Sequence, residues 1–210
     1  MQELKPYTTL APIKKALDNG GRFYNFFDKA GDEVISRGEL AKAAGVFSAG
    51  MQAFMFLEMS KQDLDAKNQE AAVNLLEPTL RKKFAKSKPS MTAPSLVEKQ
   101  HKAGQSIIVT GFARQIEDKT QFRGFIVVPI MVGKVFVPVM IPLFDRYHIF
   151  EVFDDAKMKK PSAIVAIPHK KKIDHTGPIQ FGGVLKKLTY KDKKPPEHAV
   201  FLETLFYVKR

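Results

Sequence analysis

The sequence predicts an α+β protein in which a helical N-terminal domain precedes a small C-terminal β-barrel or β-sandwich. In the first part of the chain, apolar residues recur at helical spacing between capping and stop signals. From Gln105 onward, short β-rich runs alternate with turn residues. The stretch between these parts contains prolines, serines and a glycine, as linkers do. We therefore expect a helical domain over residues 1–88, a linker over 89–104 and a β domain over 105–210.

Two helices are expected before residue 30. Thr9 is a suitable N-cap for a helix that begins at Leu10, and the sequence Asn19-Gly20-Gly21 supplies its stop signal. A second, shorter helix is expected over residues 22–28, where three phenylalanines recur.

Two further helix signals follow. Ser36 and Glu39 have the spacing of a capping box, which predicts that a helix begins at Ser36. Residues 60–86 carry alanines and leucines at helical spacing. Pro78 lies inside this run and is expected to kink or divide it, because proline lacks the N–H that a helix interior needs.

Seven strands are expected in the second half. The first contains Gly111, which marks a bend in an otherwise alternating run. The predicted strands cover residues 106–116, 125–131, 135–141, 147–153, 163–167, 179–188 and 199–208.

One apolar stretch, residues 124–144, is long enough for a transmembrane helix. It contains three prolines and a single charge, Lys134, at its middle, where a bilayer would disfavour it. The sequence Val132-Gly133-Lys134-Val135 is typical of a tight turn between two strands. We therefore expect a β-hairpin here and no membrane span.

The strand pattern resembles that of the OB-fold family. The segments Val109 to Ala113 and Phe181 to Leu188 look like OB-fold strands, in which a glycine lets a long first strand bend around both halves of the barrel. The resemblance covers about half of the chain. It implies an OB-like antiparallel barrel, and OB-folds often bind oligonucleotides through one barrel face and its loops.

The charge of the chain favours an anionic partner. The formal net charge is +12, and residues 101–210 hold 19 Lys and Arg against 10 Asp and Glu. A basic half of this kind fits nucleic acid, an acidic protein or an anionic surface. The chain has no cysteine, which excludes a disulfide framework and a thiol nucleophile. The N-terminus shows no secretory signal, so we expect a cytoplasmic protein.

The candidate nucleic-acid-binding residues are lysines at predicted loops and strand ends, together with two aromatic residues. Converging lysine loops would contact phosphates, and aromatic rings would stack on bases. The alternative is that the aromatics belong to the core and the lysines are simply solvated. The candidates are Lys157, Lys159, Lys160, Lys170, Lys171, Lys172, Lys186, Lys187, Phe112 and Tyr147.

Residues 28–39 resemble a degenerate EF-hand calcium loop. Asp28, Asp32 and Glu39 stand at loop positions one, five and twelve, where the family uses oxygen ligands. Position three is Ala30, which has no side-chain ligand, and position six is Glu33 where the loop normally has glycine. The resemblance implies weak calcium binding at most. The alternative is a capped helix–loop–helix without a metal.

An overlapping segment, residues 40–55, resembles a DNA-binding helix-turn-helix. Its spacing fits, with Gly45 at the turn. The would-be recognition helix over residues 48–58 has no Lys or Arg, which a reader of the major groove needs. A helix buried within the domain is the expectation that fits its composition.

Non-enzymatic binding is the function that the sequence favours. No nucleophile elbow, phosphate-binding glycine loop or paired catalytic carboxylate motif is visible, although a site assembled in space would not show in the sequence. We expect binding of a polyanion, most specifically single-stranded nucleic acid, through the basic loops of the barrel. The alternatives are a protein-interaction or structural module, including self-association, and a calcium-responsive module.

Overall fold

The computed structural model contains two compact units. One unit is Glu3–Ser90, and the other comprises Met1–Gln2 and Met91–Arg210. The structure describes residues 1–20, 31–45, 50–116, 125–132, 135–143, 146–159, 163–168, 173–189 and 198–210; of residues 126–130, 132 and 135–138 it describes the backbone alone.

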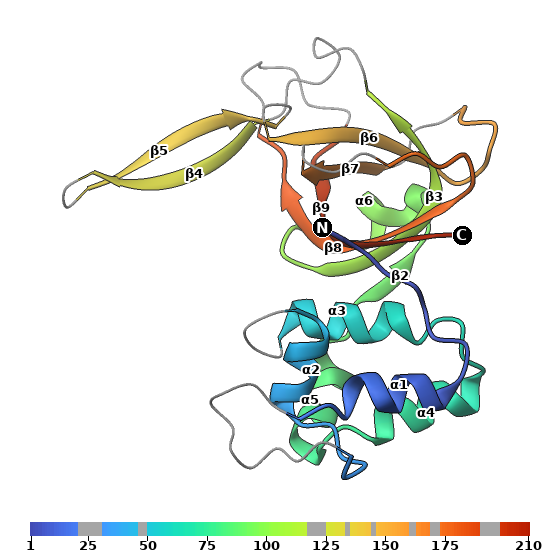
Figure 1. Cartoon of the computed structure of the whole chain (residues 1–210). Coiled ribbons are helices and arrows are strands. Elements are labelled where there is room, and N and C mark those ends of the chain that lie inside the picture. Colours follow the sequence, from blue (N-terminus) through green and yellow to red (C-terminus); the bar gives the residue numbers. More distant parts are fainter. Residues whose placement is uncertain are drawn as a thin grey trace. The chain divides into compact units, whose positions relative to one another are not determined.

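The first unit is helical, as the sequence predicts (Figure 1). Helix α3 is buried along most of its length, from Ala53 to Ser60. This burial agrees with a packing role for the segment that resembles a helix-turn-helix. The helices are α1 (Leu10–Leu17), α2 (Arg37–Ala43), α3 (Met51–Ser60), α4 (Ala66–Asn74) and α5 (Pro78–Ser87).

Local signals fix the helix ends. Thr9 is the N-cap of α1, as predicted, in an extended conformation, but its side chain makes no capping hydrogen bond. The predicted capping box at α2 is present: the N–H of Glu39 donates to Ser36 Oγ at 3.2 Å, and the N–H of Ser36 donates to Glu39 Oε2 at 2.8 Å. Pro78 divides the predicted 60–86 run and is the first residue of α5, where its missing N–H costs nothing. The helix expected over 22–28 lies outside the described residues.

The second unit is an OB-like barrel, which confirms the α+β prediction. Its strands pair in the closed ring β3–β6–β7–β9–β8–β3. All of these pairs are antiparallel except β7–β9, in which Val165 lies opposite Leu202 in parallel. The ring strands are β3 (Ser106–Gln115), β6 (Tyr147–Phe153), β7 (Ala163–Pro168), β8 (Ile179–Lys187) and β9 (Val200–Lys209).

Strand β3 closes the ring because it pairs on two sides. Its first part pairs with β8 as far as Gly111, and its last part, from Phe112, pairs with β6. A Cβ atom at Gly111 would overlap the carbonyl oxygen of Phe153 and lie 2.9 Å from the side chains of Pro94 and Val152. Glycine therefore permits the close approach of β3 to β6, as the sequence pattern suggests.

The barrel interior is filled by alternate residues of all five ring strands. Residues 89–104, expected as a linker, contain the short strand β2 (Ser90–Thr92), the 3₁₀ turn η1 (Pro94–Leu96) and helix α6 (Val97–Gln100). Val97 of α6 belongs to the interior cluster, so this helix closes off the barrel core. The short strand β1 (Gln2–Glu3) completes the elements.

The predicted hairpin is present. Strands β4 (Phe125–Val132) and β5 (Val135–Pro142) pair along their whole length, and Val132 lies opposite Val135. They form a separate twisted ribbon that extends away from the ring (Figure 1). No helix in the described ranges is long and apolar enough to cross a membrane.

The close approach at Gly111 makes a testable prediction. Gly111→Ala should lower the free energy of unfolding of the barrel by roughly 1–3 kcal/mol, because the added methyl group overlaps backbone that cannot move freely. Gly50→Ala is the control, because a Cβ there meets nothing within 4 Å. Urea unfolding followed by circular dichroism measures both variants. If both substitutions change the free energy of unfolding by the same small amount, the close approach of β3 to β6 at Gly111 does not constrain the barrel.

Candidate nucleic-acid interface

The outer face of β6, β7 and β9 is covered by the chain itself. Phe150 and Val165 point into the barrel core, so the alternate residues of these strands lie on the outside. These outer residues are nevertheless buried, because segments before β6 and after β8 pack over them. The cluster consists of Leu143, Ile149, Ile164, Ala166, Leu188 and Phe201. We call it the outer apolar cluster.

The connections that flank this cluster meet at the base of the hairpin. The N–H of Phe125 donates to the carbonyl oxygen of Thr189 at 3.0 Å, and the two residues form an isolated bridge. Thr189 follows β8, and Phe125 begins β4 in the β3–β6 connection. OB-folds use the corresponding face and the corresponding two loops to bind oligonucleotides. Here the outer apolar cluster buries side chains of that face, which an oligonucleotide would contact in other OB-folds.

Tyr147, a predicted stacking residue, is held in a polar contact. Its hydroxyl donates to Glu203 Oε1 at 2.5 Å, and Lys186 Nζ lies 3.5 Å from Glu203 Oε2. The ring packs against the outer apolar cluster. Burial, together with the adjacent Glu203 carboxylate, raises the pKa of Tyr147 well above its ordinary value. The Tyr147 hydroxyl therefore stays protonated and keeps its hydrogen bond to Glu203.

Phe112, the other predicted stacking residue, is only half-buried. It lies on the outer face of β3, opposite Phe153 of β6. Arg114 lies two residues along the same face, with its guanidinium carbon 4.9 Å from the Phe153 ring centroid. The same guanidinium forms an ion pair with Glu151. Phe112 therefore presents an aromatic surface beside a fixed cation.

Two pairs of exposed lysines flank the N-terminal ends of β7 and β9. Lys157 and Lys159 are exposed in the loop that enters β7, and Lys186 and Lys187 are exposed at the end of β8, before the connection that enters β9. Because β7 and β9 run parallel, their N-terminal ends lie side by side, and Lys187 lies opposite Val200, the first residue of β9. We call this the β7–β9 entry edge.

The remaining predicted lysines lie outside the described residues. They are Lys160, Lys170, Lys171 and Lys172. The last three follow the opposite, C-terminal end of β7, which ends at Pro168. The sequence predicts that all these lysines share one rim of the barrel, and this stays a prediction. Of the predicted lysines, Lys157, Lys159, Lys186 and Lys187 belong to the β7–β9 entry edge.

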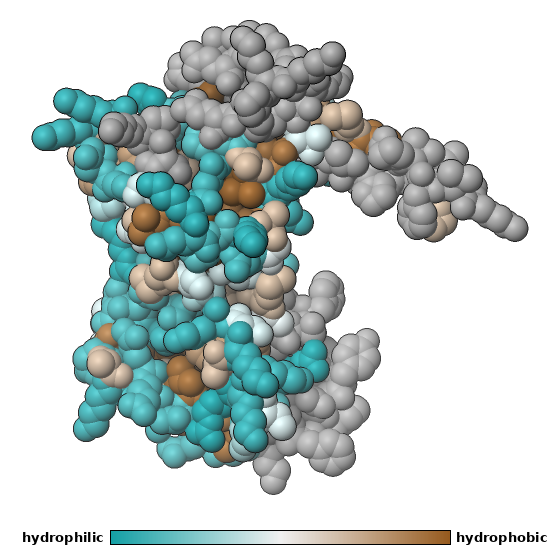
Figure 2. All heavy atoms as spheres, turned by 180° about the vertical axis from the view of Figure 1, so that it is seen from behind, coloured by the Kyte–Doolittle hydropathy of each residue, from teal (hydrophilic) through white to brown (hydrophobic). Residues whose placement is uncertain are grey.

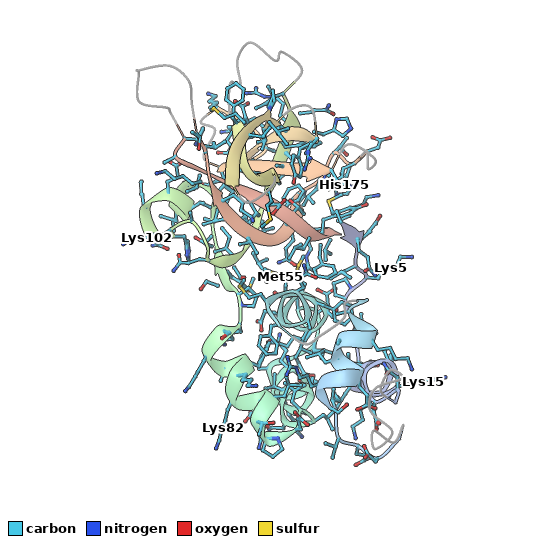
Figure 3. All side chains as sticks on the ribbon, turned by 90° about the vertical axis from the view of Figure 1, so that its left-hand side faces the viewer. Lys5, Lys15, Met55, Lys82, Lys102 and His175 are labelled. Carbon is cyan, nitrogen blue, oxygen red and sulfur yellow. The ribbon has the colours of Figure 1, made fainter. Side chains whose placement is uncertain are left out.

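Exposed lysines of the helical unit lie on more than one side of it. Lys15 and Lys82 lie on opposite sides of that unit in Figure 3, and both point outward. The barrel unit shows a mixed surface in Figure 2, with apolar residues among hydrophilic ones. The β7–β9 entry edge is therefore distinguished by the position of its loops, rather than by the amount of charge alone.

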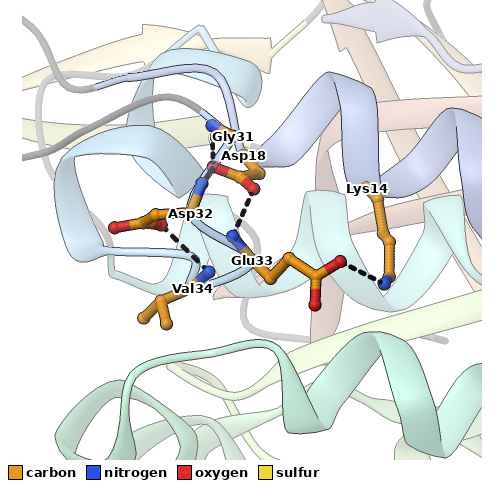
Figure 4. A network of polar contacts seen from close by, with 6 residues as sticks. All are labelled: Lys14, Asp18, Gly31, Asp32, Glu33 and Val34. Carbon is orange, nitrogen blue, oxygen red and sulfur yellow. Dashed lines mark hydrogen bonds and ion pairs between the residues drawn. The ribbon is translucent and has the colours of Figure 1, made fainter.

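The segment resembling an EF-hand is organised by Asp18. The Asp18 carboxylate accepts hydrogen bonds from the backbone N–H groups of Gly31 at 2.7 Å, Asp32 at 3.3 Å and Glu33 at 2.8 Å (Figure 4). The Asp32 carboxylate accepts from the N–H of Val34 at 3.1 Å. A side chain from the end of α1 thus shapes the loop before α2.

Glu39, the predicted twelfth loop ligand, also serves the backbone. It is buried, its Oε1 accepts from the N–H of Gly20 at 2.7 Å, and its Oε2 accepts from the N–H of Ser36 at 2.8 Å. An EF-hand needs both oxygens of this residue for the ion. Asp28 lies outside the described residues, and the described residues hold no group of three potential ligands from His, Asp and Glu. Calcium binding stays a prediction.

Several residues of this surface were not found by sequence reasoning. Arg114, Glu151 and Glu203 meet their partners across strands, and only the register of the barrel brings them together. Alternation along β3 was the one available signal, since it places Arg114 on the same face as Phe112.

Comparison with known proteins adds no family to these observations. No protein-family model, no curated protein and no solved structure matches the chain.

The Tyr147–Glu203 contact predicts a pH effect. Above about pH 10 an unfolded tyrosine loses its proton while Tyr147 in the folded protein keeps it. The unfolded state then binds fewer protons, so the free energy of unfolding falls as the pH rises. Tyr147→Phe should cost about 0.5–1.5 kcal/mol at pH 7 and make this alkaline decline shallower. Urea titrations between pH 7 and pH 11 measure both effects; parallel profiles for the two proteins would contradict the assignment.

The contacts of Glu39 predict how calcium acts. Glu39→Gln should lower the melting temperature equally with and without millimolar calcium, because the carboxylate supports backbone groups. Differential scanning fluorimetry measures the shift, with Glu70→Gln, at an exposed position of α4 away from this loop, as the control. A calcium-induced stabilisation of the parent protein that disappears in Glu39→Gln would instead support a metal site.

Proposed function

We propose that the barrel unit binds a polyanion, specifically single-stranded nucleic acid, at the β7–β9 entry edge. The observation that carries this proposal is that exposed lysines flank two strand starts that lie side by side: residues 157–159 precede β7, and Lys186 and Lys187 pair with the first two residues of β9. Lysine ammonium groups attract phosphates without reading sequence. The binding is therefore salt-dependent and not strongly base-specific.

The entry edge is favoured over the β6–β7–β9 face for a physical reason. The outer apolar cluster buries that face, and a nucleic acid would have to displace it to stack there. Tyr147, which lies on the same face, already donates its hydroxyl to Glu203. The loops at the edge carry exposed cations and need no such rearrangement.

Phe112 supplies a stacking surface close to these cations. It lies opposite Phe153, and Phe153 is the last residue of β6 before the loop that carries Lys157 and Lys159. A base stacked on Phe112 would therefore lie beside the strand end from which this loop leaves. Stacking on an aromatic ring tolerates any base, which fits binding without sequence preference.

Neutralisation of edge lysines tests the proposal. Lys157→Gln/Lys187→Gln should weaken binding of a labelled single-stranded oligonucleotide, and it should reduce the magnitude of the salt slope by about 1.4, which is 0.7 per phosphate contact. Lys187 is preferred to Lys186, which is paired with Glu203. Fluorescence anisotropy at several salt concentrations measures both quantities.

The matched control is Lys82→Gln/Lys83→Gln, which removes the same charge from exposed positions of α5. It should leave the affinity and the salt slope nearly unchanged. If both double variants weaken binding equally, attraction is a property of net charge and not of the edge. If the parent protein shows no salt-dependent binding, the proposal is wrong.

A further inference from the structure

One carboxylate on the outer face of the barrel has a different partner on each of its oxygens. Glu203 Oε1 accepts the hydrogen bond from the Tyr147 hydroxyl, and Glu203 Oε2 lies 3.5 Å from Lys186 Nζ. The Glu203 side chain is 31% exposed and that of Lys186 is 52% exposed. A lysine of the β7–β9 entry edge is therefore paired with an anion of its own chain.

The register of the ring brings these three side chains together. Glu203 lies opposite Ala166 of β7 on one side and opposite Val184 of β8 on the other. Ala166 has only a methyl side chain, which leaves room for Tyr147 of β6 to reach Glu203 across β7. Lys186 lies two residues beyond Val184 on the same face, a diagonal position that a long side chain can span.

The neighbouring lysine at this end of β8 is in a different environment. Lys187 is exposed, lies opposite Val200, and makes no ion pair with any residue that the structure describes. Alternation along a strand directs Lys186 and Lys187 to opposite sides of β8. Within the described residues, only Lys186 of the two has an anion beside it.

Counterion release explains what the Lys186–Glu203 pair does to a polyanion. A lysine that neutralises a phosphate of a single strand changes the salt slope by about 0.7. If Lys186 left Glu203 for a phosphate, the carboxylate would lose its partner and attract a cation from solution. The phosphate would also lie beside the negative charge of Glu203, which repels it. Such a contact would add little affinity and little salt dependence.

We propose that Glu203 determines which lysines of the β7–β9 entry edge contact the ligand: it keeps Lys186 from the phosphates and the nucleic-acid strand off the outer face. Discrimination by a repulsive group is a general device of specific recognition. Tyr147 holds Glu203 Oε1 and leaves Oε2 to Lys186. This inference rests on the proposed function, because it concerns the same edge and the same ligand.

A double-mutant cycle tests the role of Glu203, with fluorescence anisotropy of labelled oligodeoxythymidine at several salt concentrations. Glu203→Gln keeps an acceptor for the Tyr147 hydroxyl and loses the charge, so the magnitude of the salt slope should rise by about 0.7. Its affinity advantage over the parent protein should then grow roughly threefold between about 200 mM and 50 mM salt. Lys186→Gln should change the slope of the parent protein little, and should abolish the rise when combined with Glu203→Gln.

The matched control is Asp174→Asn, which removes the same charge at an exposed position before β8, at the end of that strand away from Lys186. It should leave the slope nearly unchanged. If the parent protein binds but Glu203→Gln does not change the slope, or if the rise persists without Lys186, the role assigned to Glu203 is wrong. A parent protein without salt-dependent binding would instead overturn the proposed function, and this inference with it.

Lysine acetylation gives a readout that needs no substitution. The parent protein is acetylated sparsely with and without oligodeoxythymidine, and mass spectrometry measures the reactivity of each lysine. The oligonucleotide should protect Lys187 and leave Lys186 as reactive as in the free protein. In the Glu203→Gln variant, Lys186 should be protected as well. Equal protection of the two lysines in the parent protein would overturn the proposal.

Discussion

The close approach of β3 to β6 at Gly111 is the constraint on which the barrel depends. One strand must pair with β8 along its first part and with β6 along its last part, and the ring closes only if the chain passes near the Phe153 carbonyl at the change of partner. Closure leaves no ring strand with an open edge and encloses one apolar core. The positions of the loops, and hence of the lysines, follow from this ring.

The connections of the ring then decide which surface remains for a ligand. The outer apolar cluster and the Phe125–Thr189 bridge tie the β3–β6 and β8–β9 connections together over one face. Covering this face stabilises the barrel and also removes the stacking platform that the fold would otherwise offer. The parallel β7–β9 pair places two strand starts side by side, and exposed lysines flank both of them. The proposed binding is therefore placed at this edge.

Sequence signals that act locally predicted their structures well. The Ser36–Glu39 capping box, the helix break at Pro78 and the hairpin around Gly133-Lys134 each depend on residues close in the chain. Gly111 also gave a usable signal, because a glycine inside an alternating strand marks a close approach. The α+β class and the OB-like barrel followed from these elements.

Contacts between distant segments did not show in the sequence. The parallel pairing of β7 with β9, the Tyr147–Glu203 hydrogen bond and the cover of Leu143 and Leu188 arise only from the register of the ring. Binding at the β7–β9 entry edge is tested most directly by ¹H–¹⁵N NMR titration with a single-stranded oligonucleotide. Binding at this edge should give salt-sensitive chemical-shift changes at residues 157–159, 186–187 and Phe112, and none in α5. Shifts confined to the helical unit, or none at low salt, would contradict it.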